Sequence, residues 1–210
     1  MENVNPTEAG GTPRKSRRWL LVVLFLLFAA PLIAAWVLYL NINRWHFGST
    51  SHGEFIQPPR QLALPTLSLP IAGGTLAADY FKGRWTLVYV GPSHCDPDCS
   101  GALYNTRQVR YAMGKKIEAV QRLYLVDGKP ADAERLTRLQ PDLTVADVSG
   151  RAGQQLVDRF SDNGSEPPAM GGYIYLVDPH GFYVMRYATH ADPKGLLKDL
   201  QRLLGGGGGM

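Results

Sequence analysis

The two cysteines of the chain, Cys95 and Cys99, are the side chains best suited to carry out chemistry. Residues four apart share one face of a helix, so both sulfurs could point at one metal ion or join as a disulfide. A helix N-terminus stabilises a thiolate, whereas the carboxylates of Asp96 and Asp98 oppose it and attract a cation. The spacing therefore predicts thiol–disulfide exchange or the capture of a soft metal, and the carboxylates favour metal capture over a strongly acidic thiol.

A purely structural disulfide is the alternative explanation of this pair. Closing a loop of about five residues stabilises a fold by roughly 2 kcal/mol in the chain-entropy model, which is less than a long loop would contribute. Two cysteines are also too few for a small scaffold held together by disulfides. We therefore favour a functional role for Cys95 and Cys99.

The cysteines follow a predicted buried strand. Residues 85–90 (WTLVYV) are aromatic, β-branched and apolar, and they lie between Gly83 and Gly91-Pro92, which is typical of a strand in a sheet core. A helix is expected over residues 98–118. In open α/β sheets, binding sites gather beyond the carboxyl ends of the strands, and the pair falls at such a place.

The rest of the domain alternates short apolar runs with helical patterns. The segment Asp178–Gly181 (DPHG) separates two such runs and predicts a hairpin, and Asp192 with Pro193 predicts the start of the last helix. The order predicts an α/β fold: a thioredoxin-like central mixed sheet flanked by helices, preceded by one N-terminal transmembrane helix. Further strands are expected at residues 67–69, 122–126, 173–177 and 182–186, and further helices at 131–138, 153–160 and 193–204.

Residues 19–40 form an uncharged, apolar run of 22 residues. As a helix it would be about 33 Å long, enough to cross a hydrocarbon core of roughly 30 Å, and Trp19, Trp36 and Tyr39 suit the membrane interfaces. A cleaved signal peptide is the alternative, but its apolar region normally has about 7–15 residues, and no clean A-x-A site closes this run. We therefore expect an uncleaved anchor.

Basic residues lie mainly on one side of this run. Four of them precede it between positions 14 and 18, whereas only Arg44 follows within the next fifteen residues. This asymmetry places the N-terminus in the cytoplasm and residues 41–210 on the far side. In a bacterium, it predicts a single-pass protein of the inner membrane with its domain in the periplasm, where cysteine pairs are oxidised or metal-bound.

The chain is expected to divide into five parts. The linker is inferred from small and polar residues together with Pro58 and Pro59. The parts are a cytoplasmic basic tail (1–18), the transmembrane anchor (19–40), a linker (41–60), the thioredoxin-like domain (61–204) and a flexible glycine tail (205–210).

Charge and composition exclude several classes of protein. The formal net charge is +4, from 22 Lys and Arg against 18 Asp and Glu. Residues 1–18 contribute +2 of this charge and the later basic residues are spread evenly, so we expect no nucleic-acid partner. A hydrophobic content of 45% with 19% charged residues excludes global disorder. The absence of a G-x-S-x-G motif gives a hydrolase little support.

The sequence around the cysteines resembles the Sco/SenC family, which comprises membrane-anchored thioredoxin-like proteins that help to assemble cytochrome c oxidase. Members carry Cys-x-x-x-Cys after a strand, in a context like F-G-Y-T-H-C-P-D-V-C-P, and residues 90–100 of this chain read VGPSHCDPDCS. The glycine, the histidine, both cysteines and their spacing coincide. The resemblance extends over about residues 65–204, including Leu125-Val126-Asp127 and the Asp178–Gly181 turn.

The resemblance implies copper as a cofactor, held by Cys95, Cys99 and a histidine that precedes the hairpin. At the equivalent place this chain has Met170, whose thioether is a soft ligand that suits Cu(I). We therefore expect a site of Cys95, Cys99 and Met170; in the alternative, Met170 only packs and copper binding is weakened or lost. His94 could adjust the thiols, and Pro168 could be the proline that thioredoxin folds place opposite the cysteines.

Three functions remain open from the sequence. The first is a copper-handling factor for oxidase assembly, whose partner is a cytochrome c oxidase subunit or another copper or thiol assembly factor. The second is a thiol–disulfide oxidoreductase in which Cys95 and Cys99 cycle between dithiol and disulfide without copper. The third is a non-catalytic scaffold in an oxidase-assembly complex. Whether the chain is an enzyme therefore depends on the chemistry of the cysteine pair.

Overall fold

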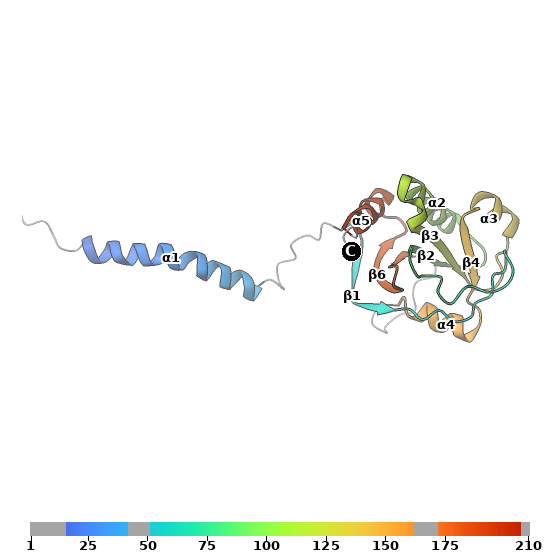
Figure 1. The fold of residues 1–210 in the computed structure, drawn as a ribbon, viewed down its shortest axis with the longest axis horizontal. Coiled ribbons are helices and arrows are strands. Elements are labelled where there is room, and N and C mark those ends of the chain that lie inside the picture. The colour runs from blue at the N-terminus through green and yellow to red at the C-terminus, as the bar shows by residue number, and fades with distance from the viewer. Residues whose placement is uncertain (1–15, 42–50, 162–171, 207–210) are drawn as a thin grey trace, which may run out of the picture. The chain divides into compact units, whose positions relative to one another are not determined.

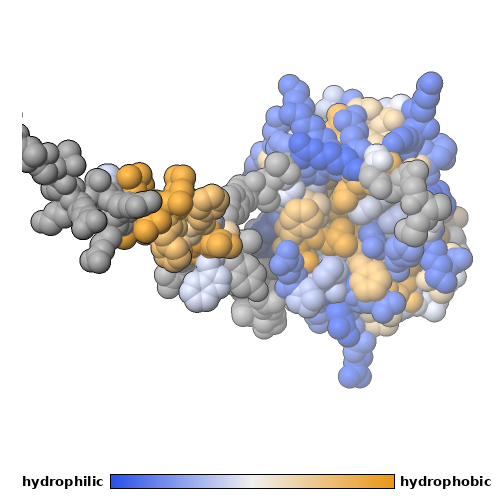
Figure 2. Space-filling view, turned by 60° about the vertical axis from the view of Figure 1, so that its left-hand side comes forward, coloured by the Kyte–Doolittle hydropathy of each residue, from blue (hydrophilic) through white to orange (hydrophobic). Residues whose placement is uncertain are grey.

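The computed structural model describes residues 16–41, 51–161 and 172–206. The chain divides into two units, residues 1–49 and 50–210. The first unit contains α1 (Ser16–Asn41), a helix of 26 residues with Pro31 inside it. Its segment Trp19–Val37 is long and apolar enough to cross a membrane, and none of it is buried; Figure 2 shows its apolar surface in orange. The predicted apolar helix near the N-terminus is confirmed.

The second unit is built on a six-stranded mixed sheet. Its strands are β1 (Glu54–Gln61), β2 (Trp85–Gly91), β3 (Val120–Val126), β4 (Leu143–Asp147), β5 (Tyr173–Val177) and β6 (Phe182–Ala188). Their order across the sheet is β1-β6-β5-β2-β3-β4 (Figure 1). The strands β2, β3 and β4 are parallel, whereas β5 and β6 form the predicted hairpin and β1 pairs antiparallel with β6. In the hairpin turn, the Asp178 carboxylate accepts the N–H groups of His180 and Phe182.

Helices cover both faces of this sheet. They are α2 (Pro97–Ala112), the 3-10 helix η1 (Gly114–Ala119), α3 (Ala133–Leu139), α4 (Arg151–Asp158) and α5 (Pro193–Gly206). Successive side chains of a strand point to opposite faces: Leu87 and Tyr89 of β2 pack with α2 and α5, whereas Val88 and Val90 pack with α4. Figure 1 shows α2 and α5 on one side of the sheet and α4 on the other. This three-layer arrangement is the predicted thioredoxin-like fold.

The expected linker ends earlier than the sequence predicts. Residues 54–61 form the edge strand β1 rather than the end of a linker over 41–60, and Ile56 is buried in the core. Pro58 and Pro59 lack N–H groups, which only an edge strand tolerates, and the register of β1 against β6 shifts across them. The folded domain therefore begins at about residue 54.

Other element boundaries also differ from the expectation. The strand expected at 67–69 is an isolated bridge between Ser68 and Thr75, and β4 is an additional strand at the far edge of the sheet. The helix expected over 98–118 is split into α2 and η1. Its break lies at Gly114, whose φ of 56° is a left-handed conformation that glycine adopts readily.

The last helix begins as predicted but runs further. The Asp192 carboxylate accepts the N–H of Lys194 at the start of α5. This helix continues to Gly206, so the first residues of the expected glycine tail are helical. The remainder of the expected tails and linker, residues 1–15, 42–50 and 207–210, lies outside the described residues.

Candidate functional site

A disulfide joins Cys95 and Cys99 beyond the carboxyl end of β2. Their Cα atoms are 5.2 Å apart, within the usual range for a disulfide. Pro97 is the first residue of α2, a position that suits proline because the first N–H of a helix has no partner within the helix. The pair therefore lies between a buried strand and a helix, as the sequence predicts.

Asp96 caps α2 and fixes the position of the second cysteine. Its carboxylate accepts the backbone N–H of Cys99 over 2.8 Å, which stabilises the start of the helix. Asp98 lies in the first turn and is exposed. From the sequence we expect both carboxylates to attract a cation to the sulfurs, but the structure uses that of Asp96 to hold the backbone around the disulfide.

The two sulfurs differ in their access to solvent. Cys99 is completely buried, with 0% of its surface exposed. Cys95 is partly exposed, and its Sγ lies 3.8 Å from the hydroxyl of Ser100. Because exchange requires an attacking thiolate to reach a sulfur, Cys95 is the half of the disulfide that another molecule can reach.

Two buried tyrosines lie behind the disulfide. The hydroxyl oxygen of Tyr124 is 3.7 Å from Cys99 Sγ, and its O–H donates to the carbonyl of Pro92. The ring centroids of Tyr89 and Tyr124 are 5.6 Å apart. Burial raises the pKa of Tyr89 to about 12 and also raises the pKa of Tyr124. Both phenols are therefore neutral at physiological pH, so Cys99 Sγ faces an uncharged hydroxyl.

Gly91, the last residue of β2, leaves room for these tyrosines. A Cβ atom at this position would lie 2.6 Å from Cε1 of Tyr89 and 3.2 Å from Cε2 of Tyr124. The first distance is shorter than any ordinary carbon–carbon contact. The glycine that the sequence shares with the Sco/SenC motif is thus explained by close packing beneath the disulfide.

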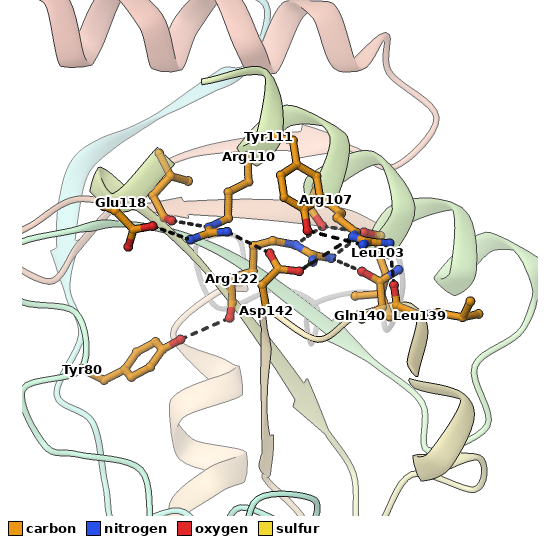
Figure 3. A network of polar contacts seen from close by, with 12 residues as sticks. Tyr80, Leu103, Arg107, Arg110, Tyr111, Glu118, Arg122, Leu139, Gln140 and Asp142 are labelled. Atoms are coloured by element: carbon orange, nitrogen blue, oxygen red, sulfur yellow. Dashed lines mark hydrogen bonds and ion pairs between the residues drawn. The ribbon is translucent and has the colours of Figure 1, made fainter. Parts of the chain in front are cut away.

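Arg122 of β3 is the centre of a buried polar network (Figure 3). Its side chain is fully buried and forms an ion pair with Asp142 over 3.1 Å. The guanidinium also donates to the Thr106 hydroxyl, the Gln140 side chain and the carbonyl of Leu103. Burial lowers its pKa to about 10, opposed by the charge of Asp142, so the guanidinium stays charged at neutral pH. The network ties α2 to the segment between α3 and β4.

A pocket of about 430 Å³ opens beside the disulfide, between α2 and α3. Cys95 contributes to its lining and Cys99 does not. His94 is exposed at the same end of the pocket. The accessible sulfur therefore lies at the wall of a cavity large enough for several side chains.

The predicted copper ligands are only partly placed by the structure. Cys95 and Cys99 are together, but Met170 and the neighbouring Pro168 lie outside the described residues. Within the described part of the chain, no group of three or more His, Cys, Asp and Glu side chains could hold a metal ion. The described donors for copper are thus two sulfurs, a set that suits Cu(I) once the disulfide is reduced.

Some residues of the site have no clear signal in the sequence. Tyr89 and Tyr124 look like ordinary strand residues until the fold brings their rings together beneath the cysteines. Arg122 could have been noticed as a charged residue within an apolar strand, since such a residue must find buried partners. Its partner Asp142 lies between α3 and β4, and nothing in the sequence around Asp142 marks it as the partner of a buried arginine.

Comparison with known proteins supports the fold. The model of the family described as "Transmembrane-like, thioredoxin-like, C-terminal domain" matches residues 85–205. A search of curated proteins gives no match. The match covers the cysteine pair and every strand of the sheet except β1.

Solved structures of Sco proteins share this fold at low sequence identity. The apo Sco1 protein of Thermus thermophilus has a TM-score of 0.57 at 17% identity, covering 73% of this chain and 96% of that one. ScoI of Bradyrhizobium japonicum with copper bound has a TM-score of 0.53 at 21% identity, covering 67% and 98%. BsSco, described as a Sco-family cytochrome c oxidase assembly protein with a disulfide switch, has a TM-score of 0.50 at 14% identity, covering 70% and 96%. The resemblance inferred from the cysteine motif is confirmed at the level of the fold.

Proposed function

Because the chain belongs to the family of transmembrane-like, thioredoxin-like C-terminal domains, we propose that it is a membrane-anchored, Sco-like protein that exchanges its Cys95–Cys99 disulfide with the thiols of a partner protein. The observation that carries this proposal is the asymmetry of the disulfide, since Cys99 is buried and Cys95 is accessible. Exchange with a dithiol needs one sulfur that the partner can reach and a second that leaves and later returns.

The exchange proceeds through a mixed disulfide. A thiolate of the partner attacks Sγ of Cys95, the bond to Cys99 breaks, and Cys99 leaves and takes up a proton. The second thiolate of the partner then attacks the partner's own sulfur in the mixed disulfide and releases Cys95. The partner loses two electrons and two protons, which this chain gains, and the reverse steps reduce a disulfide in the partner.

The proposed place of action is supported by α1 and the charges before it. The helix would anchor the chain in the inner membrane of a bacterium, with residues 41–210 in the periplasm. Disulfides persist in that compartment. BsSco is described as an assembly protein for cytochrome c oxidase, so the partner of this chain would be an oxidase subunit or another assembly factor with paired cysteines.

Binding of Cu(I) is a second proposed function of the same pair. A fold neighbour, ScoI of Bradyrhizobium japonicum, was solved with copper bound. In this chain Cys95 and Cys99 would hold the ion as thiolates, and the sequence predicts the thioether of Met170 as the third ligand. Copper would be the cargo that the protein carries for oxidase assembly. The disulfide form would be the state in which no copper is bound.

The reduction potential of the pair tests the proposed exchange. The purified full chain in detergent is equilibrated with dithiothreitol buffers, and thiols are counted by alkylation. We expect a midpoint above about −300 mV, because structural disulfides lie below that value. A midpoint below it would identify an inert disulfide and contradict the proposal. In Cys99→Ser, the Cys95 thiolate can attack a disulfide of an oxidised partner, and no second thiol remains to release it, so a stable mixed disulfide should form; Cys95→Ser should form none.

Competition for Cu(I) tests the second function. The reduced full chain is titrated against a chromogenic Cu(I) chelator, alongside Met170→Leu and the double variant Cys95→Ser with Cys99→Ser. We expect binding tighter than micromolar that is lost in the double variant and weakened in Met170→Leu. Binding no tighter than micromolar in the parent chain rejects the function, and an unchanged affinity in Met170→Leu rejects that residue as a ligand.

The non-catalytic scaffold is separated from both functions by activity in cells. A scaffold predicts that the double variant Cys95→Ser with Cys99→Ser, produced at normal level, leaves oxidase assembly intact. We expect instead that the double variant is deficient in oxidase, measured by haem spectra and oxygen uptake of membranes.

A further inference from the structure

We propose that the pocket between α2 and α3 binds an extended segment of the partner protein in which the reactive cysteine lies close to a large apolar residue and an acidic residue. The proposal rests on the proposed thiol exchange, because it concerns what reaches Cys95. It specifies the chemistry of the partner segment, which the disulfide alone does not.

The pocket is a groove with two helical walls that start together at the disulfide. One wall is a face of α2 that includes Ser100, Leu103 and Arg107, and the other is a face of α3 that includes Leu136. Residues three or four apart share a helix face, so the first set forms a continuous stripe. Because Cys95 lines the same groove, a segment lying along the stripe begins at the accessible sulfur.

Hydrogen bonds close the groove at both ends. At the end near the disulfide, the N–H of Ala131 donates to the carbonyl of Ser93 over 2.9 Å. At the far end, the Arg107 guanidinium donates to the carbonyl of Leu139 over 2.8 Å. The two walls therefore run in the same direction from the disulfide.

The length of the groove suits about three residues of an extended chain. Ser100 and Arg107 are seven residues apart on α2, which corresponds to about 10 Å along a helix. An extended chain advances about 3.3 Å per residue, so three residues cover the same distance. A partner cysteine bonded to Cys95 would thus place its near neighbours in the groove.

The walls present apolar surface to such a segment. Leu103 and Leu136 contribute to the lining, and the large side chains of Tyr104 and Leu139 are 57% and 47% exposed. Tyr111, just beyond the far end, is also exposed and stacks with Arg107. Among the described residues of the domain, the only other large apolar side chain this exposed is Phe55. Exposed apolar surface is therefore concentrated at this groove, as expected for a docking site.

The charged side chains of the lining are Arg107, Arg135 and Asp132, so the groove has a net positive charge. Arg135 is exposed, and its guanidinium has no hydrogen-bond or ion-pair partner among the described residues. The other charged side chains of the lining are already engaged: Arg107 donates to the Leu139 carbonyl, and Asp132 accepts the backbone N–H of Arg135 at the start of α3. A carboxylate on the partner segment would pair with Arg135.

The buried network around Arg122 holds the groove in shape before the partner arrives. Its guanidinium donates to Leu103 on one wall and to Gln140 at the end of the other. A groove that is already formed loses little conformational entropy on binding. The same network explains how a cavity persists between two helices that would otherwise pack together.

Reduction of the disulfide by synthetic thiol peptides tests this proposal. The oxidised full chain in detergent is mixed with a peptide containing Cys-Leu-Glu, with its reversed order Glu-Leu-Cys, and with Cys-Ser-Lys as the matched control. A neutral small thiol, 2-mercaptoethanol, measures the intrinsic reactivity of the disulfide. We expect one of the two acidic peptides to react at least tenfold faster than the control peptide, at equal thiolate concentration.

Three variants locate the preference. Arg135→Glu should reverse the preference for the acidic peptide, and Leu139→Ser should reduce it severalfold. Arg138→Glu is the matched control, because Arg138 is exposed on the same helix but does not line the groove. Arg138→Glu should leave both the peptide preference and the rate with 2-mercaptoethanol unchanged.

The outcomes separate the groove from the function on which it depends. If 2-mercaptoethanol reduces the disulfide and all peptides react alike, the groove proposal is overturned while the exchange function stands. An equal loss of preference in Arg138→Glu and Arg135→Glu also overturns it, since a general charge effect would then explain the rates. If no thiol reduces the disulfide, both proposals fail.

Discussion

The hydroxyl oxygen of Tyr124 lies 3.7 Å from the Sγ atom of Cys99, while the hydroxyl hydrogen is used by the carbonyl of Pro92. In the reduced state a Cys99 thiol could therefore donate to this oxygen, and the contact would stabilise the protonated thiol. The buried half of the pair is thus placed to accept a proton when the disulfide opens.

Replacing Tyr124 by Phe should make the disulfide harder to reduce. The reduced state loses an acceptor for its buried thiol, which we expect to cost about 1 kcal/mol, or a shift of roughly 20 mV to more negative potential. Equilibration with dithiothreitol buffers measures the shift. Tyr89→Phe is the matched control, because the Tyr89 hydroxyl has no hydrogen-bond partner among the described residues and its removal should leave the potential unchanged. A shift to more positive potential in Tyr124→Phe would show that the hydroxyl stabilises the oxidised form instead.

Replacing Gly91 by Ala should destabilise the domain by about 1–3 kcal/mol, because the new Cβ overlaps the ring of Tyr89 at 2.6 Å. Urea unfolding monitored by tyrosine fluorescence measures the change. Gly101→Ala is a control with the opposite expected sign: it lies within α2 and its Cβ would have no neighbour within 4 Å, so it should stabilise the helix by about 0.5–1 kcal/mol. Equal effects of the two substitutions would contradict the packing argument.

Replacing Arg122 by Met should cost about 3–5 kcal/mol of unfolding free energy, because it removes a buried cation from the partners that surround it. Thr106→Val, which removes a single acceptor of the guanidinium, should cost about 1–3 kcal/mol and can be studied if the first variant does not fold. Arg138→Met, at an exposed position, should change stability by no more than about 0.5 kcal/mol. Thermal and urea unfolding of all three variants give the comparison. A loss below about 1 kcal/mol in Arg122→Met would contradict the stabilising role of Arg122 in the buried network.

Acid should weaken the loop after β3 through Asp147. Its pKa lies below the ordinary value, chiefly because the backbone N–H of Ser149 donates to the carboxylate, and the N–H of Gly128 donates as well. A carboxyl group with a lowered pKa in the folded state stabilises the fold above its unfolded pKa of 3.8, and this contribution is lost as the pH falls through the folded value. We therefore expect the parent chain to lose stability more steeply below about pH 4 than Asp147→Asn. Urea midpoints between pH 6 and pH 3 measure this, and parallel curves would contradict it.

The sequence predicts the fold where local patterns agree with the tertiary structure. The run 85–90 and the two runs on either side of the Asp178–Gly181 turn are apolar and lie next to glycine and proline. This pattern predicts strands. The strand β1 was not predicted, because Pro58 and Pro59 are typical of a linker and are tolerated in a strand at a sheet edge. The strand β4 was not predicted either, because only two of its five residues are buried.

The candidate site is also predictable from the sequence only where its residues are close together along the chain. Cys95 and Cys99 are close in the sequence, so their pairing could be inferred before the structure. The contacts of Tyr124 with Cys99 and of Arg122 with Asp142 join residues 25 and 20 positions apart, and no local pattern specifies them. The groove beside Cys95 depends on two helices from different parts of the chain, so its shape emerges only from packing.

The prolines of β1 also affect how copies of this protein can associate. Unpaired backbone groups along the edge of a sheet are a template for another strand. Pro58 and Pro59 lack N–H groups and so interrupt the row of donors along β1, and the register of β1 against β6 shifts across them. Continuous strand-to-strand growth through β1 is therefore disfavoured, which protects the domain from aggregation through this edge.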